Sequence, residues 1–376
     1  MIYFDNAATS SPKPLCVVNA VKNALESYSA NPGRSGHKAS IKVAEKIYGV
    51  REKVAAFFGC ESPENVVFTA NCTQAINFVL KGVLTKGDHL IISNLEHNAV
   101  ARPAKKLEEN GVMLSIFNAF AQDLEEEIER YITPKTKMLF CLHASNVCGR
   151  VLPIEKIGRL CKKRGVLFGV DAAQSAGVLP IDMKKCGIDY LCIASHKGLF
   201  APMGTGILIA SSPINETVLE GGTGSNSISL DQGRDMPEML ESGTVNVPGI
   251  MGISAGIDFV KKRGMDSIRE HEMRLCKHLC KKLYGQKGIR IIGFDENYSV
   301  PVVSFCVDGM DSNEVAALLS SKNIAVRAGL HCSPLAHKTL GTLETGTVRF
   351  APGLLSDTRQ VDRLCYVLSD IVAKKF

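Results

Sequence analysis

Short apolar runs alternate with amphipathic segments from about residue 40 to about residue 210, and this alternation constrains the fold more than any other feature. The runs are rich in Val, Ile, Leu and Phe and are nearly continuous in hydrophobicity, which is typical of strands buried on both faces of a parallel sheet. We expect strands at 66–70, 90–93, 138–144, 166–172 and 190–195. The segments between them have helical patterns, often ending in basic residues and glycine. Strands alternating with helices predict βαβ crossovers and an α/β fold with a mainly parallel sheet.

The pattern changes after about residue 250. We expect one long helix at 253–284, strands within 289–294, 300–307 and 324–329, and helices at 312–322 and from about 357. This order fits antiparallel strands with helices on one side. The sequence therefore predicts a large α/β domain at residues 15–250 and a smaller α+β domain formed by residues 1–14 and 251–376.

The overall composition excludes several classes of protein. Hydrophobic residues make up 45% and charged residues 22% of the 376 residues, which is typical of a globular protein and argues against disorder. The net charge is +6, from 44 Lys and Arg against 38 Asp and Glu, and no basic run dominates. Aromatic residues are 6% and Trp is absent. We therefore expect no nucleic-acid partner.

No stretch approaches the roughly 18 apolar residues of a membrane span, and the N-terminus has an acid at Asp5 and no apolar core of a signal peptide. The 13 cysteines are scattered and odd in number, and none forms a C-x-x-C pair. A disulfide scaffold or a structural zinc site would show paired, regular spacing. We expect a cytoplasmic protein with no membrane association and no metal.

Polar side chains follow each predicted strand of the first region. In an open α/β sheet, ligands bind at the carboxyl ends of the strands, so these side chains are candidates for a site. They are Asn71, Cys72 and Thr73 after the first strand, Glu96 and His97 after the second, Asn146 after the third, Asp171 and Gln174 after the fourth, and Ser195, His196 and Lys197 after the fifth.

These residue types match the parts of one cofactor. A helix N-terminus with the Thr73 hydroxyl favours a phosphate, Asp171 can pair with a protonated ring nitrogen, and Lys197 can form a Schiff base with an aldehyde. Taken singly, each has an ordinary interpretation: a helix cap for Thr73 or Asp171, a structural histidine for His97, a solvated side chain for Lys197. Their common position after strands favours pyridoxal 5′-phosphate.

Two segments, VDAAQSAG at 170–177 and ASHKGLFAPMGTGIL at 194–208, resemble the pyridoxal-phosphate enzymes of the class V aminotransferase fold, which belong to fold type I. The segment VRAGLHCSP at 326–334 resembles the active-site loop of group II cysteine desulfurases and selenocysteine lyases. Further similar segments are YFDNAATS at 3–10, FTANCTQAIN at 68–77, LEHNAVARP at 95–103, ESGTVN at 241–246 and GTVRFAPG at 346–353. The resemblance covers essentially the whole chain.

The resemblance implies a role for each matching residue. Lys197 would hold the cofactor aldehyde, Asp171 its pyridine nitrogen and Gln174 its ring hydroxyl, with His97 stacked on the ring and assisting proton movement. Cys72, Thr73 and His196 would hold the phosphate, and Thr244 would reach the phosphate in the other subunit of a homodimer. Asn146 and Arg349 would bind the substrate carboxylate, and Cys332 would accept the sulfur, with positive charge from Arg327 and His331 beside it.

The reaction implied is the removal of sulfur from L-cysteine, giving L-alanine and a persulfide on Cys332, which a sulfur-acceptor protein or a reductant would discharge. Such a persulfide would serve iron–sulfur cluster assembly, thio-cofactor synthesis or selenium metabolism. Three alternatives stay open at this point: a selenocysteine lyase, an aminotransferase of the same superfamily in which Cys332 is dispensable, and a cofactor-binding regulator or sulfur-carrier scaffold with little turnover.

Two positions depart from the family pattern. Cys72 stands where many relatives have a hydroxyl residue, and Ala194 stands where many have Ser or Thr two positions before the histidine. The phosphate site is therefore expected to have fewer hydroxyl groups, with Ser195 as a candidate replacement.

Overall fold

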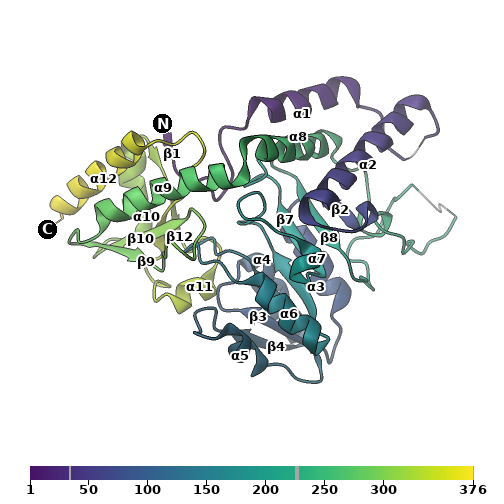
Figure 1. Ribbon diagram of the computed structural model, residues 1–376, viewed down its shortest axis with the longest axis horizontal. Helices are drawn as coiled ribbons and strands as arrows, with labels where there is room; N and C mark the ends of the chain where they lie inside the picture. Colours follow the sequence, from purple (N-terminus) through teal and green to yellow (C-terminus); the bar gives the residue numbers. More distant parts are fainter. Residues whose placement is uncertain (34, 225–227, 376) are drawn as a thin grey trace.

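A seven-stranded sheet in the order β2-β8-β7-β6-β5-β3-β4 is the main element of the computed structural model, which describes residues 1–33, 35–224 and 228–375 (Figure 1). Neighbouring strands are parallel except that β8 is antiparallel to both β7 and β2. The strands are β2 (Val66–Thr69), β3 (His89–Ser93), β4 (Met113–Phe117), β5 (Thr136–Leu142), β6 (Leu167–Asp171), β7 (Tyr190–Ala194) and β8 (Gly206–Ala210). The predicted mainly parallel α/β sheet is confirmed.

All five strands predicted from apolar runs are present, and two further strands were not predicted. Strand β4 lies at the sheet edge and only Phe117 is buried, so the continuous apolar pattern of a central strand does not apply to it. Strand β8 begins within the segment 194–208, which the sequence analysis used for the family resemblance and not for a strand.

Helices cover both faces of this sheet. The core on one face contains Leu139 and Cys141 of β5, and the core on the other face contains Met138 and Phe140 of the same strand. The first core is covered by α2 (Lys38–Phe58), α6 (Ile154–Arg164) and α8 (Val247–Arg263), and the second by α3 (Cys72–Val83) and α4 (Asn98–Glu109). Helix α1 (Leu15–Ser27) packs on α8. The remaining helices of this region are α5 (Leu124–Glu129), α7 (Met183–Cys186) and 3₁₀ turns at Pro63–Asn65 and Glu238–Leu240.

The C-terminal region has its own sheet in the order β12-β13-β10-β9, antiparallel as expected. Its strands are β9 (Ile289–Ile292), β10 (Val303–Val307), β12 (Arg327–Gly329) and β13 (Thr347–Phe350), and a separate parallel pair joins β1 (Ile2–Tyr3) to β11 (Ile324–Ala325). The one strand predicted within 324–329 forms two strands in different sheets, and β13 was not predicted. Helices α9 (Met265–Leu283), α10 (Ser312–Ser321) and α12 (Thr358–Ala373) share one core with these strands, and α11 (Pro334–Thr339) follows β12. Both termini therefore lie in this region (Figure 1).

The single helix predicted at 253–284 is wrong. Helices α8 and α9 are separated by Gly264, whose φ of 86° a helix interior does not allow. Helix α8 contributes Ile250, Ile253 and Ile257 to the core of the large sheet, so position 250 falls inside it. The domain limits at residues 15–250 and 251–376 stay a prediction.

No helix in the described ranges is long and apolar enough to cross a bilayer.

Candidate active site

A cavity of about 240 Å³ lies at the carboxyl ends of the strands in the large sheet. It brings together polar residues that follow five different strands of the sequence, as expected for an open α/β sheet, although Glu96 and Ser195 are not among its lining residues. Its lining includes Asn71, Cys72, Thr73, His97, Asn146, Asp171, Gln174, His196 and Lys197.

Asp171 ends β6 and is buried at one wall of the cavity. Its Oδ1 accepts a hydrogen bond from the backbone N–H of Ala173 at 2.8 Å and the Cys72 thiol at 3.6 Å. Its Oδ2 has no hydrogen-bonding partner in the part of the chain that the structure describes. Burial raises the pKa of the Cys72 thiol, with the Asp171 carboxylate adding to the effect, so Cys72 is a neutral donor here.

Lys197 follows β7 in a tight turn, and its Nζ has neither an ion pair nor a hydrogen bond within the described residues. Burial lowers the pKa of Lys197, although the nearby Asp171 carboxylate acts in the opposite direction. A neutral amine, which can act as a nucleophile or a base, is thereby favoured.

His97 is the N-cap of α4, where its Nδ1 accepts the backbone N–H of Ala99 at 3.0 Å. Since Nδ1 accepts, the proton of the neutral ring resides on Nε2. Burial lowers the pKa of His97, which favours this neutral form.

The phosphate end of the predicted site is the start of α3. Asn71 caps the helix through a hydrogen bond from the Gln74 N–H at 2.9 Å, and the first backbone N–H groups of the helix have no intrahelical acceptor. Nearby, His196 has a buried Nδ1 without a partner in the described chain, and burial lowers its pKa to about 4. Ser195, by contrast, is fully buried and does not line the cavity, so it does not replace the missing hydroxyl groups.

Gln174 also lines the cavity and donates from Nε2 to the backbone oxygen of Ala7 at 3.0 Å. The N-terminal segment therefore forms part of the wall around the cavity.

Cys332 lies in a loop between β12 and α11 and is solvent-exposed. Arg327 Nη2 lies 3.3 Å from its Sγ. Both His331 (φ 48°) and Cys332 (φ 59°) have left-handed backbone conformations, which cost free energy in non-glycine residues and persist only where the surroundings hold them.

Four hydrogen bonds hold this loop. Asn146 Nδ2 donates to the backbone oxygen of His331 at 2.7 Å, and its Oδ1 accepts from Ser333 Oγ at 2.8 Å. The backbone N–H of Asn98 donates to the Cys332 oxygen at 2.7 Å, and His331 Nε2 lies 2.9 Å from Thr347 Oγ1. Burial lowers the pKa of His331 to about 2, so the ring is neutral. The prediction that His331 adds positive charge beside Cys332 is therefore wrong.

Arg349, on β13, is 1% exposed. Its Nη2 pairs with Asp5 Oδ1 at 2.7 Å, its Nη1 donates to the backbone oxygen of Asn146 at 3.1 Å, and its buried Nε has no partner among the described residues. Asp5 is the residue that the sequence analysis missed, because it served there only as an acid in the N-terminal segment. A partner of Arg349 cannot be found from spacing, since the two residues are 344 positions apart.

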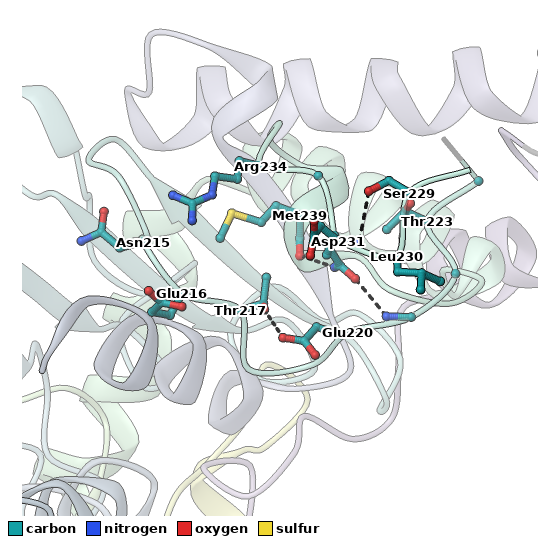
Figure 2. Close-up of a pocket in the computed structure, with 15 residues that line it drawn as sticks. Asn215, Glu216, Thr217, Glu220, Thr223, Ser229, Leu230, Asp231, Arg234 and Met239 are labelled. Atoms are coloured by element: carbon teal, nitrogen blue, oxygen red, sulfur yellow. Dashed lines mark hydrogen bonds between the residues drawn. The ribbon is translucent and has the colours of Figure 1, made fainter. Parts of the chain in front are cut away.

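Thr244 lies apart from the Lys197 cavity. It is exposed and accepts from Asn31 Nδ2 at 3.4 Å. A larger cavity, of about 940 Å³, lies on the segment 215–239 (Figure 2), and its lining contains none of the predicted site residues and no Lys, His or Cys. We therefore place the site at the smaller cavity.

The chain matches the family model described as aminotransferase class V over residues 2–364. It therefore belongs to the class V aminotransferase family, whose members depend on pyridoxal phosphate.

Within this family the chain is a cysteine desulfurase. It is 33% identical to a probable cysteine desulfurase of Methanothermobacter thermautotrophicus, covering 98% of this chain and 94% of the relative. It is 35% identical to a probable cysteine desulfurase of Borreliella burgdorferi, covering 89% and 83%. Among solved structures, the apo cysteine desulfurase of Thermococcus onnurineus is 32% identical, with a TM-score of 0.90 over 99% of this chain and 95% of that chain.

Proposed function

We propose that this cysteine desulfurase takes sulfur from L-cysteine, releases L-alanine and holds the sulfur as a persulfide on Cys332. The observation that carries the proposal is the position of Cys332. This thiol lines a groove that shares Thr73, His97 and Ala99 with the cavity around Lys197. A nucleophile with a guanidinium 3.3 Å away therefore lies next to the cavity in which a substrate would bind.

The residues present fit pyridoxal 5′-phosphate. A carboxylate oxygen, an amine and an imidazole nitrogen are without partners in the described part of the chain, on Asp171, Lys197 and His196. When bound, the cofactor supplies an electron sink for negative charge developing on the substrate Cα. The residues that would hold it are Asp171 at the ring nitrogen, Gln174 at the ring hydroxyl, Lys197 at the aldehyde, His97 over the ring, and Cys72, Thr73 and His196 at the phosphate.

Lys197 would act as the base that removes the Cα proton, because its lowered pKa favours the neutral amine. His97 would position a proton at Nε2, since its Nδ1 is occupied by the Ala99 N–H.

The Cys332 thiolate would attack the substrate sulfur, with Arg327 stabilising its negative charge. An S–S bond forms and the Cβ–S bond of the substrate breaks, and Cβ takes up a proton. Cysteine and one enzyme thiol become alanine and one enzyme persulfide, so the step needs no external oxidant.

Arg349 would bind the substrate carboxylate through donors not used by Asp5 and the Asn146 backbone, including Nε. Asn146 would assist through its second Nδ2 hydrogen while holding the Cys332 loop with the other.

We further propose a homodimer in which Thr244 reaches the phosphate site of the second subunit, on the strength of its exposure and its separation from the cavity in its own chain. A cytoplasmic location is supported by the cysteines, all 13 of which are free thiols.

The experiment is alanine formation from L-cysteine with excess thiol and pyridoxal phosphate, comparing the wild type, Cys332→Ser and Cys16→Ser. Cys16 is an exposed cysteine on α1 and serves as the matched control. We expect equimolar alanine and sulfide from the wild type and Cys16→Ser, and neither product from Cys332→Ser, with unchanged cofactor absorbance. Equal alanine from all three would refute Cys332 as the acceptor.

The same assay separates the alternatives. A selenocysteine lyase would keep activity towards selenocysteine in Cys332→Ser, and an aminotransferase would require a keto acid. A regulator or scaffold would bind the cofactor and release no alanine.

A further inference from the structure

The exposed Cys332 thiol lines a groove of about 420 Å³ between α3 and α4. Lys81 in the last turn of α3, and Arg102 and Lys106 on α4, line this groove, which we call the basic groove. The hydrogen bond from the Asn98 N–H to the Cys332 oxygen, at 2.7 Å, attaches the thiol-bearing loop to the start of α4. The remaining lining residues are Thr73, Asn77, His97, Asn98, Ala99 and Pro103.

Two of the three cationic side chains that line the basic groove have no acidic partner in the described part of the chain. No Asp or Glu is among its lining residues. Lys81 and Arg102 have no ion pair within the described residues, whereas Lys106 pairs with Glu109 at 3.2 Å. Arg327, 3.3 Å from the thiol, adds a further positive charge beside Cys332.

Lys105, outside the groove, differs from Lys81 and Arg102 in having an acidic partner. Lys105, adjacent in sequence, does not line the groove and is paired with Glu108 at 2.7 Å. Two exposed cations without partners, on adjacent helices and beside a nucleophilic thiol, form a surface that favours an anion.

We infer that the basic groove binds the carboxylates of a small anionic thiol, which takes the sulfur from Cys332. This inference rests on the proposed persulfide. The volume of the groove lies in the range of about 300–1,000 Å³ that is typical of small-molecule sites. Cys332 lines the same groove, so the thiol group of a molecule bound there would lie beside the Cys332 sulfur.

The transfer is an exchange at sulfur. The thiolate of the bound molecule attacks the outer sulfur of the Cys332 persulfide, a new S–S bond forms on the small molecule, and the bond to Cys332 breaks. Cys332 leaves as a thiolate and the outer sulfur keeps its proton, so the product is a small-molecule persulfide. A second equivalent of the same thiol then releases sulfide and forms a disulfide.

The test uses the holoenzyme with saturating L-cysteine and measures alanine and sulfide at increasing acceptor concentration. The acceptors are mercaptosuccinate, with two carboxylates, and neutral 2-mercaptoethanol. The variants are Lys81→Gln/Arg102→Gln and the matched control Lys105→Gln, and neither alters a residue that we place in the catalytic machinery.

We expect the double variant to raise the KM for mercaptosuccinate by about three- to tenfold at low ionic strength, with kcat unchanged. This is the size of effect expected when two solvent-exposed ion pairs between protein and ligand are lost. The KM for 2-mercaptoethanol should stay constant in all variants, and added salt should reduce the difference. The KM for L-cysteine and the cofactor absorbance should also stay constant.

An unchanged KM for mercaptosuccinate, or an equal rise for both thiols, would overturn the inference while leaving the desulfurase function intact. If wild-type enzyme forms no alanine with either thiol, the proposed function itself fails. An acidic peptide with one cysteine serves as a third acceptor. If only its KM rises in the double variant, the groove serves a protein acceptor and the assignment to a small thiol is wrong.

Discussion

Arg51 and Glu241 form a buried ion pair, and we expect its loss to lower the stability of the fold. The two side chains are 8% and 9% exposed, and the guanidinium is bidentate on the carboxylate, with Nη1–Oε1 at 2.8 Å and Nη2–Oε2 at 2.5 Å. Arg51 also donates to the backbone oxygen of Val66, and Glu241 accepts the N–H of Phe68 at 2.6 Å. The pair thus joins α2, β2 and the segment that leads to Thr244.

Arg51→Met keeps the side-chain stem and leaves the Glu241 carboxylate buried without its counter-charge. Removal of one partner from a buried pair costs about 3–5 kcal/mol. The unfolding entropy of 376 residues is about 0.8 kcal/mol/K near 60 °C, so we expect the Tm to fall by about 4–6 °C.

The double variant Arg51→Met/Glu241→Gln removes the unpaired charge and keeps an acceptor for the Phe68 N–H. We expect it to recover about half of the loss, because the uncompensated carboxylate is the larger part of the cost. Calorimetry at fixed protein and cofactor concentrations measures both shifts. A Tm decrease below about 1 °C in the single variant, or a double variant no more stable than the single one, would contradict this expectation.

Three further predictions concern the surroundings of the site. In Gly206→Ala the new Cβ would lie 2.4 Å from the backbone carbon of Asn71, so we expect weaker cofactor binding in an absorbance titration, because the start of α3 must shift. Burial raises the pKa of Glu272 to about 8, and the side chain therefore stays protonated in the folded state. Since the unfolded chain releases this proton near pH 4.5, stability decreases as pH rises from about 4.5 to 8, and Glu272→Gln should gain a few kcal/mol over wild type across that range in urea unfolding. Asn146→Ala removes both side-chain contacts to the Cys332 loop, so we expect at least a tenfold lower rate of alanine formation with cofactor absorbance retained.

Each of these three predictions has a result that would contradict it. Gly233→Ala, whose Cβ would meet nothing within 4 Å, is the control for Gly206→Ala, and equal cofactor affinity in both would contradict the clash. A pH-independent stability difference for Glu272→Gln would show that its carboxyl titrates normally. Full activity in Asn146→Ala would mean that the loop is held by its other bonds.

The layers of the large sheet and most of the site residues can be predicted from the amino-acid sequence. Buried parallel strands need apolar side chains on both faces, so their positions and the polar residues at their carboxyl ends can be read from a local pattern. Residues such as Thr73, His97, Asp171 and Lys197 follow such strands directly, and the cavity contains all four. The break at Gly264 escaped this reasoning, because apolar side chains continue on both sides of it.

Contacts between residues that are distant in the sequence become apparent in the folded chain alone. Asp5 pairs with Arg349, Asn146 holds the Cys332 loop, and His331 loses its charge, because residues far apart in the chain enclose them. Burial and counter-charges set the protonation of such groups, and both depend on neighbours that no local pattern specifies. The reactive residues can therefore be identified from the sequence, whereas their protonation states and contacts depend on how the two regions pack against each other.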